Sequence, residues 1–592
     1  MALTYVGARD VLRQPATVRW VGFTGSALLG ISAFVGGAFP FTDINTSPFQ
    51  LFDGPNGALI VTLWAFGITG LVGAWLAGRH FIGRGILTTR WVIVTATLWM
   101  LPMLVCPPIG SRDVYAYACQ GALVAAGHSP YQEGVAALPC QWLDSVSVIW
   151  RDTPAPYGSL FLMIAGLAAK TGSLAAAIVV FRLLAVIGVA MIALFLPMLA
   201  RRVGVPVDRA LWLVLACPLV VVHLIGGGHN DALAIGLLLA GFTLLAGRPN
   251  RTSALVLGGV LIGFSIAVKT TIGAVLPFGV FLAAGGPALP ALGILVRKAV
   301  AVMGAALATV LGLAWGSGLG MFGWITSLSH AGLPDVWTSP PSAVGIAVNY
   351  LERPFGLHYN TAPIFQFIAI IALPIVLLAI VWHSRNHDPL YGAGLAMLAT
   401  IFLAPIVQSW YLVWPLALFA ATRARIRWFA IAVAFLALLI LPDGTSVAAI
   451  VKAPMSFVMT GIVVWTVVRG FTWLRGYEPK EIDFGAPRTA TAAGPAYADL
   501  RGSGDPALSH GTTTSDRVEP VVTGRPADDR LLDDRLVDDR PLDDRSVDER
   551  AVDDVVTEAE AIAEEGSVTS TQPAGSTGSA DRSAAALPPD GG

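Results

Sequence analysis

Residues 175–199 read AAAIVVFRLLAVIGVAMIALFLPML, and this stretch sets the fold class. Arg182 is its only charged residue. About 20 consecutive apolar residues are enough for a helix to cross the hydrocarbon core of a bilayer. Similar apolar runs recur from residue 19 to residue 473. The sequence therefore predicts an all-α protein, a polytopic transmembrane helical bundle.

Composition supports a membrane protein. The 592 residues are 55% hydrophobic and 13% charged, with a net charge of −1, whereas soluble domains carry about 25% charged residues. The mean hydropathy is +0.69. We expect a multi-pass protein of the cell membrane, surrounded by lipids and without a nucleic-acid partner. The apolar runs predict 13 to 14 spans, at 19–39, 57–77, 90–106, 175–199, 209–226, 231–247, 252–268, 271–285, 297–315, 363–382, 391–406, 411–422, 428–441 and 456–473.

Positive charge predicts the orientation, because Lys and Arg accumulate in cytoplasmic loops. Lys- and Arg-bearing connections alternate along the chain, which puts them on one side. The N-terminal segment 1–18 falls on that side, ahead of a transmembrane domain at 19–475, and so does the C-terminal tail. The basic connections are 78–90, 200–209, 247–251, 297–298, 383–388 and 422–427.

The opposite connections are expected outside the cell, and the two largest are loops 107–174 and 316–362. The first ends in an apolar but short stretch, 155–172. If this stretch crossed the bilayer, the basic residues at 200–202 would lie outside. We therefore predict an interfacial or re-entrant helix there.

Residues 484–592 have a different composition, rich in Ala, Gly, Pro, Ser, Thr and Asp. Within them, residues 527–554 repeat every five positions with Asp and Arg. Five matches neither a helical nor a strand period, so we predict a disordered acidic tail.

Two cysteines, Cys119 and Cys140, fall in the first large outer loop. They would form a disulfide if this loop faces an oxidising compartment. The sequence leaves that pairing open.

Polar residues converge on the predicted outer rim from four separate connections. They are Arg112 and Asp113, the turn GGGHND at 226–231, Lys269, and the aromatic turn VQSWYLVWP at 407–415. Ionisable residues in membrane helices are costly and mark functional sites.

Each feature also has a structural explanation. Arg112 and Asp113 could form only a local ion pair, and the polar end of GGGHND could be a helix cap. Lys269 could extend to the headgroups. Trp410, Tyr411 and Trp414 fit an interfacial aromatic belt.

Several chemistries are not indicated. The sequence has no Walker loop, no GxGxxG opening a Rossmann unit, no HExxH and no clustered Cys/His site. We expect neither a metal nor a cofactor.

Several of these stretches resemble a known family. They are SRDVYAYACQGALVAAGHSPY (111–131), IWRDTPAPYGSLFL (149–162), HLIGGGHNDALAIGLLLAG (223–241), GWITSL (323–328), VWTSPPS (336–342) and IVQSWYLVWPL (406–416). Over about residues 15–475 the chain resembles the actinobacterial polyprenyl-phosphate-mannose-dependent α-(1→6)-mannopyranosyltransferases of the lipomannan pathway. Ser159 and Ser409 stand where that family usually has Pro, and Asp231 stands where Glu is expected.

The resemblance implies a membrane glycosyltransferase of the C-type fold. It implies a polyprenyl-phosphate-mannose donor and, as acceptor, an α-(1→6)-mannan chain anchored on a phosphatidylinositol mannoside. Transfer would occur on the outer face and invert the anomeric centre, leading to lipomannan and lipoarabinomannan of the cell envelope.

This chemistry suggests roles for the rim residues. A sugar hydroxyl needs a general base, and Asp113 is our candidate. A leaving phosphate needs cations, for which Lys269, Arg182 and Arg112 are candidates. The substrate-binding candidates are Tyr115, Tyr117, Tyr131, Tyr157, His229, Asn230, Asp231, Gln408, Trp410 and Tyr411.

Two alternatives stay open at this point. The transferred sugar could be arabinofuranose or glucose on a similar carrier. The chain could instead be a lipid or sugar transporter, although transporters place charge near the midplane and often show internal repeats.

Overall fold

The structure, a computed structural model, describes residues 14–40, 44, 47–82, 85–285, 291–327 and 336–474. They all belong to one compact unit, Met1–Gly504. Residues 1–13 and the tail 484–592 lie outside the described residues, so the predicted disorder of the tail stays a prediction. Every regular element in the described ranges is a helix, apart from one isolated bridge between Ile440 and Ser446. The all-α prediction is confirmed.

Within the described ranges, six helices are long and apolar enough to cross a membrane. A bent pair, α9 (Val207–Leu215) and η3 (Val220–Gly226), would make a seventh span with a 58° bend. The six are α2 (Pro15–Gly36), α4 (Gly57–Gly78), α8 (Leu174–Arg202), α13 (Leu292–Ser317), α16 (Ala362–Ser384) and α20 (Lys452–Leu474).

The expectation of 13 to 14 spans exceeds this number. The remaining predicted spans do contain apolar helices, but these have 17 residues or fewer. Apolar composition continues through positions where the backbone leaves the helix, so composition overstates helix length. The shorter helices are α5 (Thr89–Val105), α10 (Asp231–Gly247), α11 (Thr252–Val268), α12 (Leu276–Ala284), α17 (Pro389–Phe402), α18 (Val413–Ala420) and α19 (Arg427–Ala437).

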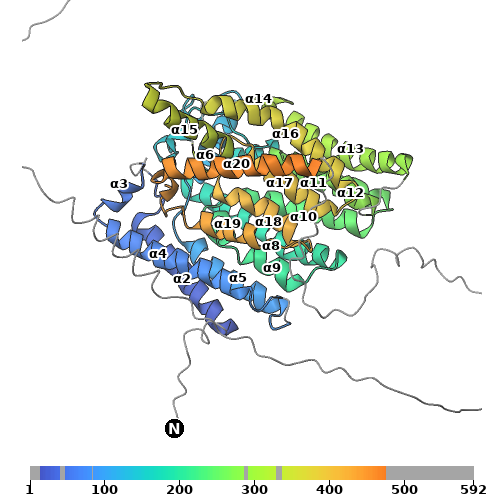
Figure 1. Cartoon of the computed structure of the whole chain (residues 1–592), viewed down its shortest axis with the longest axis horizontal. Helices are drawn as coiled ribbons and strands as arrows, with labels where there is room; N and C mark the ends of the chain where they lie inside the picture. Colours follow the sequence, from blue (N-terminus) through green and yellow to red (C-terminus); the bar gives the residue numbers. More distant parts are fainter. Residues whose placement is uncertain are drawn as a thin grey trace, which may run out of the picture. The chain divides into compact units, whose positions relative to one another are not determined.

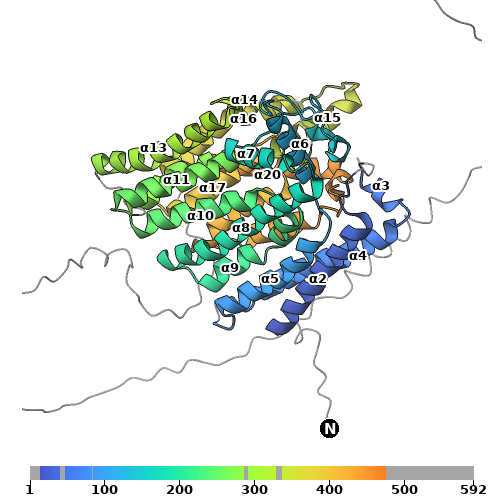
Figure 2. The same ribbon diagram turned by 180° about the vertical axis from the view of Figure 1, so that it is seen from behind.

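Neighbouring helices pack closely at small residues. Helices α2, α4 and α5 form one group, and α8, α10, α11 and α13 follow one another side by side (Figures 1 and 2). A Cβ at Gly188 of α8 would lie 2.2 Å from the backbone of Ala232 in α10. A Cβ at Gly259 of α11 would lie 2.3 Å from the carbonyl oxygen of Val302 in α13. Small residues at such interfaces let membrane helices approach each other.

The two stretches predicted as large outer loops are partly helical. The first contains α6 (Asp113–Ala125) and α7 (Ser159–Ala169), which pack on each other, and the second contains α14 (Gly323–Ser327) and α15 (Pro340–Glu352). With 11 residues, α7 is too short to span a bilayer. Its predicted interfacial or re-entrant placement stays a prediction.

Cys119 of α6 is bonded to Cys140, so the pairing left open by the sequence is made in the structure. The disulfide ties α6 to the irregular segment that follows it. The N-terminus of α6, where Asp113 lies, is therefore part of a cross-linked unit.

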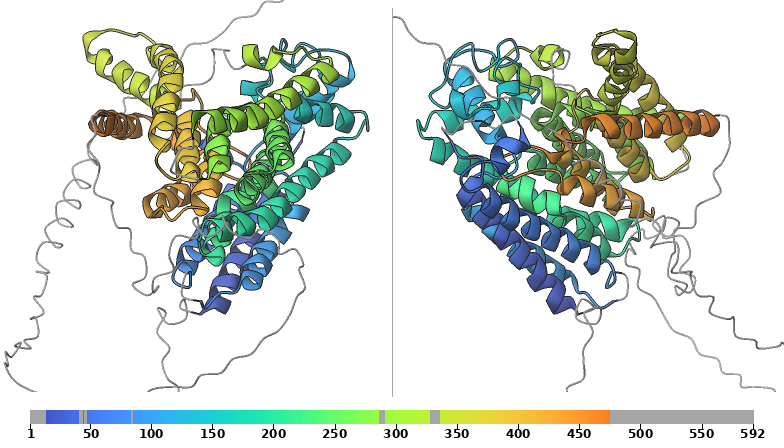
Figure 3. Two further views of the ribbon diagram at one scale, coloured as in Figure 1. Left: turned by 90° about the vertical axis from the view of Figure 1, so that its right-hand side faces the viewer. Right: turned by 60° about the vertical axis from the view of Figure 1, so that its left-hand side comes forward.

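At the other end of the described chain, α20 packs on α15 and lies at the periphery of the helices (Figure 3). Apolar side chains are exposed around its C-terminal half, including Ile462, Val464, Trp465, Val467 and Val468. Such a surface suits contact with lipid.

Candidate active site

The turn between η3 and α10 carries three polar side chains into the protein interior. Gly228 has φ +66°, a left-handed conformation that suits glycine. A Cβ at Gly226 would lie 2.6 Å from Ile109, so the backbone approaches its neighbours closely. The following residues, His229, Asn230 and Asp231, are each at most 1% exposed.

Asp231 forms a buried ion pair with Lys269. Lys269 Nζ lies 3.2 Å from Asp231 Oδ1, and the two side chains are 6% and 0% exposed. Lys269 stands where α11 ends and the 3-10 helix η4 (Thr270–Val275) begins. Trp414 of α18 donates its indole N–H to the same Asp231 oxygen at 2.8 Å. The alternative explanation, that Lys269 only extends to the headgroups, is wrong because its ammonium is buried against a carboxylate.

Aromatic rings surround the Lys269 ammonium. Its Nζ lies 5.0 Å from the ring centre of Tyr157, 4.9 Å from that of Tyr411 and 5.4 Å from that of Trp414. Cation–π contacts of this kind stabilise a desolvated cation. The ammonium is thus held by one carboxylate and three rings.

Asp113, the first residue of α6, reaches the same cluster through His229. His229 Nδ1 lies 3.7 Å from Asp113 Oδ2, 3.9 Å from Asp231 Oδ2 and 3.3 Å from the Tyr117 hydroxyl. Among the described residues, His229 is the one basic side chain within 4 Å of the Asp113 carboxylate, and no Arg or Lys comes that close. The alternative that Asp113 merely pairs with Arg112 is therefore wrong.

Asp113 is the member of the Asp113–His229–Asp231–Lys269 cluster that remains most accessible. Its side chain is 12% exposed, compared with 0% for His229 and Asp231. Burial raises the pKa of the Asp113 carboxyl to about 6, and the nearby charge of Lys269 opposes that rise. A carboxylate with such a pKa is ionised at neutral pH and can accept a proton efficiently.

Two tryptophans from the 407–415 turn, Trp410 and Trp414, line the cluster. Trp410, in the 3-10 helix η6 (Ser409–Leu412), packs against His229 with ring centres 4.2 Å apart and the ring planes tilted by 34°. Trp410 and Trp414 are 4% and 3% exposed. The expectation of an interfacial aromatic belt is wrong for these two tryptophans, because they lie inside the protein.

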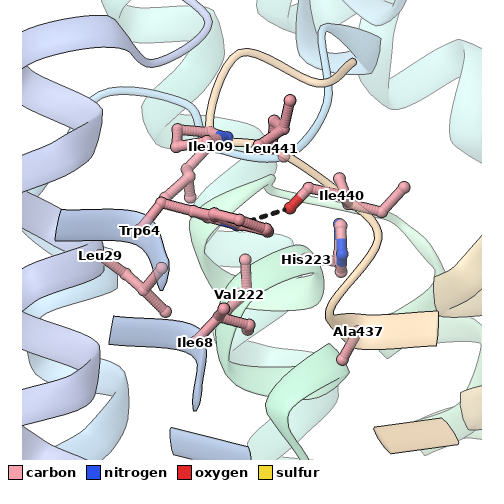
Figure 4. A pocket seen from close by; sticks show the side chains of 11 residues that line it. Leu29, Trp64, Ile68, Ile109, Val222, His223, Ala437, Ile440 and Leu441 are labelled. Atoms are coloured by element: carbon pink, nitrogen blue, oxygen red, sulfur yellow. Dashed lines mark hydrogen bonds between the residues drawn. The ribbon is translucent and has the colours of Figure 1, made fainter. Parts of the chain in front are cut away.

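A small cavity lies beyond this stack. His223 of η3 forms part of its wall, together with side chains of α2, α4 and the end of α19 (Figure 4). Trp64 crosses the cavity and donates its indole N–H to the carbonyl oxygen of Ile440 at 2.9 Å. His223 also packs against Trp410, with ring centres 5.0 Å apart and the ring planes tilted by 34°. The cavity is largely apolar and borders the cluster without including its charged groups.

Some predicted site residues point elsewhere. Arg112 donates to the carbonyl oxygens of Phe39 at 3.0 Å and Ser145 at 3.5 Å. Arg182 donates to the carbonyl oxygens of Leu104 at 3.1 Å and Gly226 at 3.0 Å. The Tyr115 hydroxyl donates to the carbonyl oxygen of Ala38. These contacts brace the backbone around the site, and the predicted phosphate contacts of the two arginines stay predictions.

Three further predicted residues are not part of the charged cluster's contacts. Gln408 precedes η6, and Tyr131 is buried with its hydroxyl unpaired among the described residues. Asn230 occupies the N-cap position of α10, but its side chain makes no capping bond and both of its amide atoms are unpaired among the described residues. A capping role for the Asn230 side chain is therefore wrong.

Our sequence-based choice of site residues missed Trp414, which we assigned only to a belt. It stands three residues after Tyr411, so both lie on one helix face. Their rings stack with centres 4.7 Å apart. The three-residue spacing between Tyr411 and Trp414 is the sequence feature that could have indicated Trp414 as a site residue. Among the described residues no three His, Cys, Asp or Glu side chains are arranged to hold a metal ion.

The fold and the cluster define a class of protein: a multi-pass helical membrane protein with a buried carboxylate–histidine–lysine site at the ends of its helices. The family model "Alpha-(1->6)-mannopyranosyltransferase, N-terminal domain" matches residues 19–285. The model "MptB C-terminal domain" matches residues 341–469. The chain belongs to the α-(1→6)-mannopyranosyltransferase family.

Individual relatives agree with this assignment. A probable α-(1→6)-mannopyranosyltransferase of Mycolicibacterium smegmatis is 33% identical over 529 residues, 81% of this chain and 93% of the relative. An α-(1→6)-mannopyranosyltransferase of Mycobacterium tuberculosis is 32% identical over 472 residues, 69% of this chain and 79% of the relative. A third, from Corynebacterium glutamicum, is 28% identical over 514 residues, 78% of this chain and 83% of the relative. No solved structure matches the chain.

Proposed function

We propose that this protein is an inverting α-(1→6)-mannosyltransferase. It moves mannose from polyprenyl-phosphate-mannose to an α-(1→6)-mannan chain anchored on a phosphatidylinositol mannoside. Its relatives are named α-(1→6)-mannopyranosyltransferases, which supports the transferred sugar and the linkage. The observation that carries the proposal is the buried cluster. In it the least buried carboxylate, Asp113, lies beside His229, and the ammonium of Lys269 lies beside Asp231.

Each charged group has a task in this reaction. The Asp113 carboxylate accepts the proton of the acceptor's O6 hydroxyl as that oxygen forms a bond to the anomeric carbon of the donor mannose. The bond from the anomeric carbon to the phosphate oxygen breaks, and its electron pair stays on the departing polyprenyl phosphate. Lys269 offsets the charge that develops on this phosphate. One displacement of this kind inverts a β-linked donor into an α-linked product.

Four of the predicted aromatic residues line the cluster in this proposal. Tyr117, Tyr157, Tyr411 and Trp410 supply aromatic faces and hydroxyl groups next to the charged cluster. Flat aromatic faces and hydroxyl groups suit a sugar chain, which presents both C–H surfaces and polar groups. No metal or cofactor takes part in this scheme.

The disulfide supports placing the reaction on the outer side of the membrane. Disulfides persist in oxidising compartments and are rare in the cytosol. Cys119 lies on α6, six residues after Asp113, so the cross-link and the base belong to the same helix. Lipid-anchored donor and acceptor would then meet at the outer leaflet, where the product would enter lipomannan and lipoarabinomannan synthesis.

The test measures transfer of label from polyprenyl-phosphate-[14C]mannose to a short α-(1→6)-mannoside, using membranes that contain the full-length protein. We expect wild-type protein to incorporate label and Asp113→Asn to lose at least about 10²-fold in kcat, the usual contribution of a general base. Asp152→Asn, at an exposed position of the same connection, is the matched control and should retain activity.

Other results would redirect the proposal. Full activity of a folded Asp113→Asn protein would remove Asp113 as the base. If wild type uses a polyprenyl-phosphate-arabinose donor instead, the sugar assignment is wrong while the reaction class stands. If it consumes neither lipid-linked sugar, the transferase proposal fails.

A further inference from the structure

His229 occupies the position between the two carboxylates of the cluster. Its Nδ1 faces three oxygen atoms, on Asp113 at 3.7 Å, Asp231 at 3.9 Å and Tyr117 at 3.3 Å. Asp113 and Tyr117 are four residues apart on α6 and therefore share one face of that helix. One ring nitrogen thus connects α6 to the turn before α10.

The His229 ring has little freedom to rotate. It is 0% exposed and packs against the tilted ring of Trp410, with ring centres 4.2 Å apart. Tyr117 contacts it edge-on, with ring centres 6.4 Å apart. The direction of Nδ1 is consequently set by packing as well as by polar contacts.

The surroundings assign one tautomer to this histidine. Burial, and secondarily the charge of Lys269, lower the pKa of His229 well below its usual value, so the ring is neutral and carries one N–H. Its Nε2 has no hydrogen-bond partner among the described residues. A proton on Nδ1 lies within hydrogen-bond distance of the Tyr117 hydroxyl and faces the two carboxylates, whereas a proton on Nε2 would be buried and unpaired.

Other groups also act on the Asp113 carboxyl. The charge of Lys269 and hydrogen bonds with the Ser111 and Trp150 side chains favour its ionised form, whereas burial and the charge of Asp231 oppose it. Lys269 Nζ is itself paired with Asp231 at 3.2 Å, so the His229 N–H would add a nearby donor to this set. The separation of 3.7 Å between His229 and Asp113 exceeds a hydrogen bond, but such contacts commonly shorten when substrate binds.

We propose that His229 is a positioning residue whose Nδ1–H holds the Asp113 carboxylate ionised and oriented toward the acceptor hydroxyl. The proposal rests on the proposed function, and it separates the task of His229 from direct binding of the donor sugar. Hydrogen bonds to the charged form of a carboxyl group favour that form. Loss of the N–H should therefore change how activity depends on pH.

The experiment compares pH profiles of kcat/KM for mannosyl transfer by full-length wild type and three variants. His229→Phe keeps the ring on Trp410 and removes the N–H, whereas His229→Asn restores an amide N–H near the position of Nδ1. His223→Phe is the matched control, since His223 is also buried and also stacks on Trp410 but makes no contact with Asp113 among the described residues.

We expect His229→Phe to lower kcat about 10²-fold, the effect of a small misplacement of a reacting group. Its acid limb should move to higher pH by about one unit, which corresponds to a tenfold weaker preference for the ionised carboxylate. The KM for the donor should stay within about twofold. His229→Asn should keep the acid limb near the wild-type position, and His223→Phe should match wild type.

An unmoved acid limb in folded His229→Phe, or an equal shift in His223→Phe, would overturn the proposal. A raised donor KM with unchanged kcat would assign His229 to sugar binding and overturn it as well. If His229→Phe does not fold, His229→Asn is compared with His229→Gln, whose amide lies nearer Nε2, and equal profiles would reject the proposal. A wild-type protein that transfers no mannose would instead reject the proposed function.

Discussion

At the scale of single residues, the cluster combines two carboxylates, a neutral histidine and an ammonium group. Their mutual contacts compensate for burial of these polar groups in an apolar interior. Lys269 is compensated by Asp231 and by three rings, while Asp113 keeps a partly open carboxyl. This difference in exposure is the reason that the proposed mechanism assigns contact with the acceptor to Asp113.

The raised pKa of Asp113 predicts a pH dependence. The base acts in its ionised form, and the ionised fraction falls as the pH drops through about 6. We expect kcat/KM to fall about tenfold per unit below that pH and to level off above it, provided that the free enzyme is measured. A rate that stays constant from well below to well above pH 6 would contradict an essential Asp113 carboxylate.

The buried ion pair predicts a double-variant result. Lys269→Met leaves the Asp231 carboxylate buried without its cation, which should lower the free energy of unfolding by about 3–5 kcal/mol. Adding Asp231→Asn to this variant should recover most of that loss, because the unpaired charge is gone, while transfer activity stays lost. Unfolding of each purified variant in detergent, followed by circular dichroism, measures the two changes in stability, and the transfer assay measures activity. Equal stability of Lys269→Met and wild type would show that the pair is not important for folding.

At the scale of elements, the cluster residues lie at the ends of short helices and in turns, and not within the long membrane-spanning helices. Asp113 begins α6, Lys269 separates α11 from η4, and Asp231 begins α10. Such breaks expose side chains at the ends of helices, where a membrane protein can bring polar groups together without crossing lipid with them.

The disulfide gives a direct test of which side α6 faces. After mild reduction of intact cells, we expect a membrane-impermeant maleimide to label Cys140, because this residue is partly exposed in the structure. The unpaired cysteines Cys106 and Cys217 are buried and serve as internal controls that should not react. Labelling of Cys140 only after the cells are opened would place α6, and with it Asp113, on the cytoplasmic side.

At the scale of the whole molecule, both family models lie between residues 19 and 469. The cluster residues, from Asp113 to Trp414, fall inside that range. The cluster contacts within the described residues all join residues of this matched range.

Deletion of residues 488–592 should leave transfer activity within about twofold of wild type, since a compositionally biased segment of this kind does not build a packed core. Membranes with matched amounts of both proteins, judged by an N-terminal tag, provide the comparison. A truncated protein that is folded but inactive would give the tail a role in catalysis or partner binding.

The amino-acid sequence alone was enough to predict an all-α membrane protein and to single out most residues of the buried cluster. Apolar runs of sufficient length have few other solutions, because backbone groups in lipid must be satisfied within helices. Ionisable residues next to such runs, such as Asp113 and Lys269, are rare enough to stand out. The number of spans was less predictable, since composition does not mark where a helix ends.

The pairing of those residues came only from the folded chain. Lys269 meets Asp231, and Trp414 meets the same carboxylate from a position 183 residues away. Arg112 and Arg182 are equally conspicuous in the sequence, yet they hold backbone carbonyl groups. A local sequence pattern does not tell which helix ends meet, because packing between distant segments decides it. The same packing decides that Asp113, Asp231 and Lys269 join the cluster while Arg112 and Arg182 bind the backbone around it.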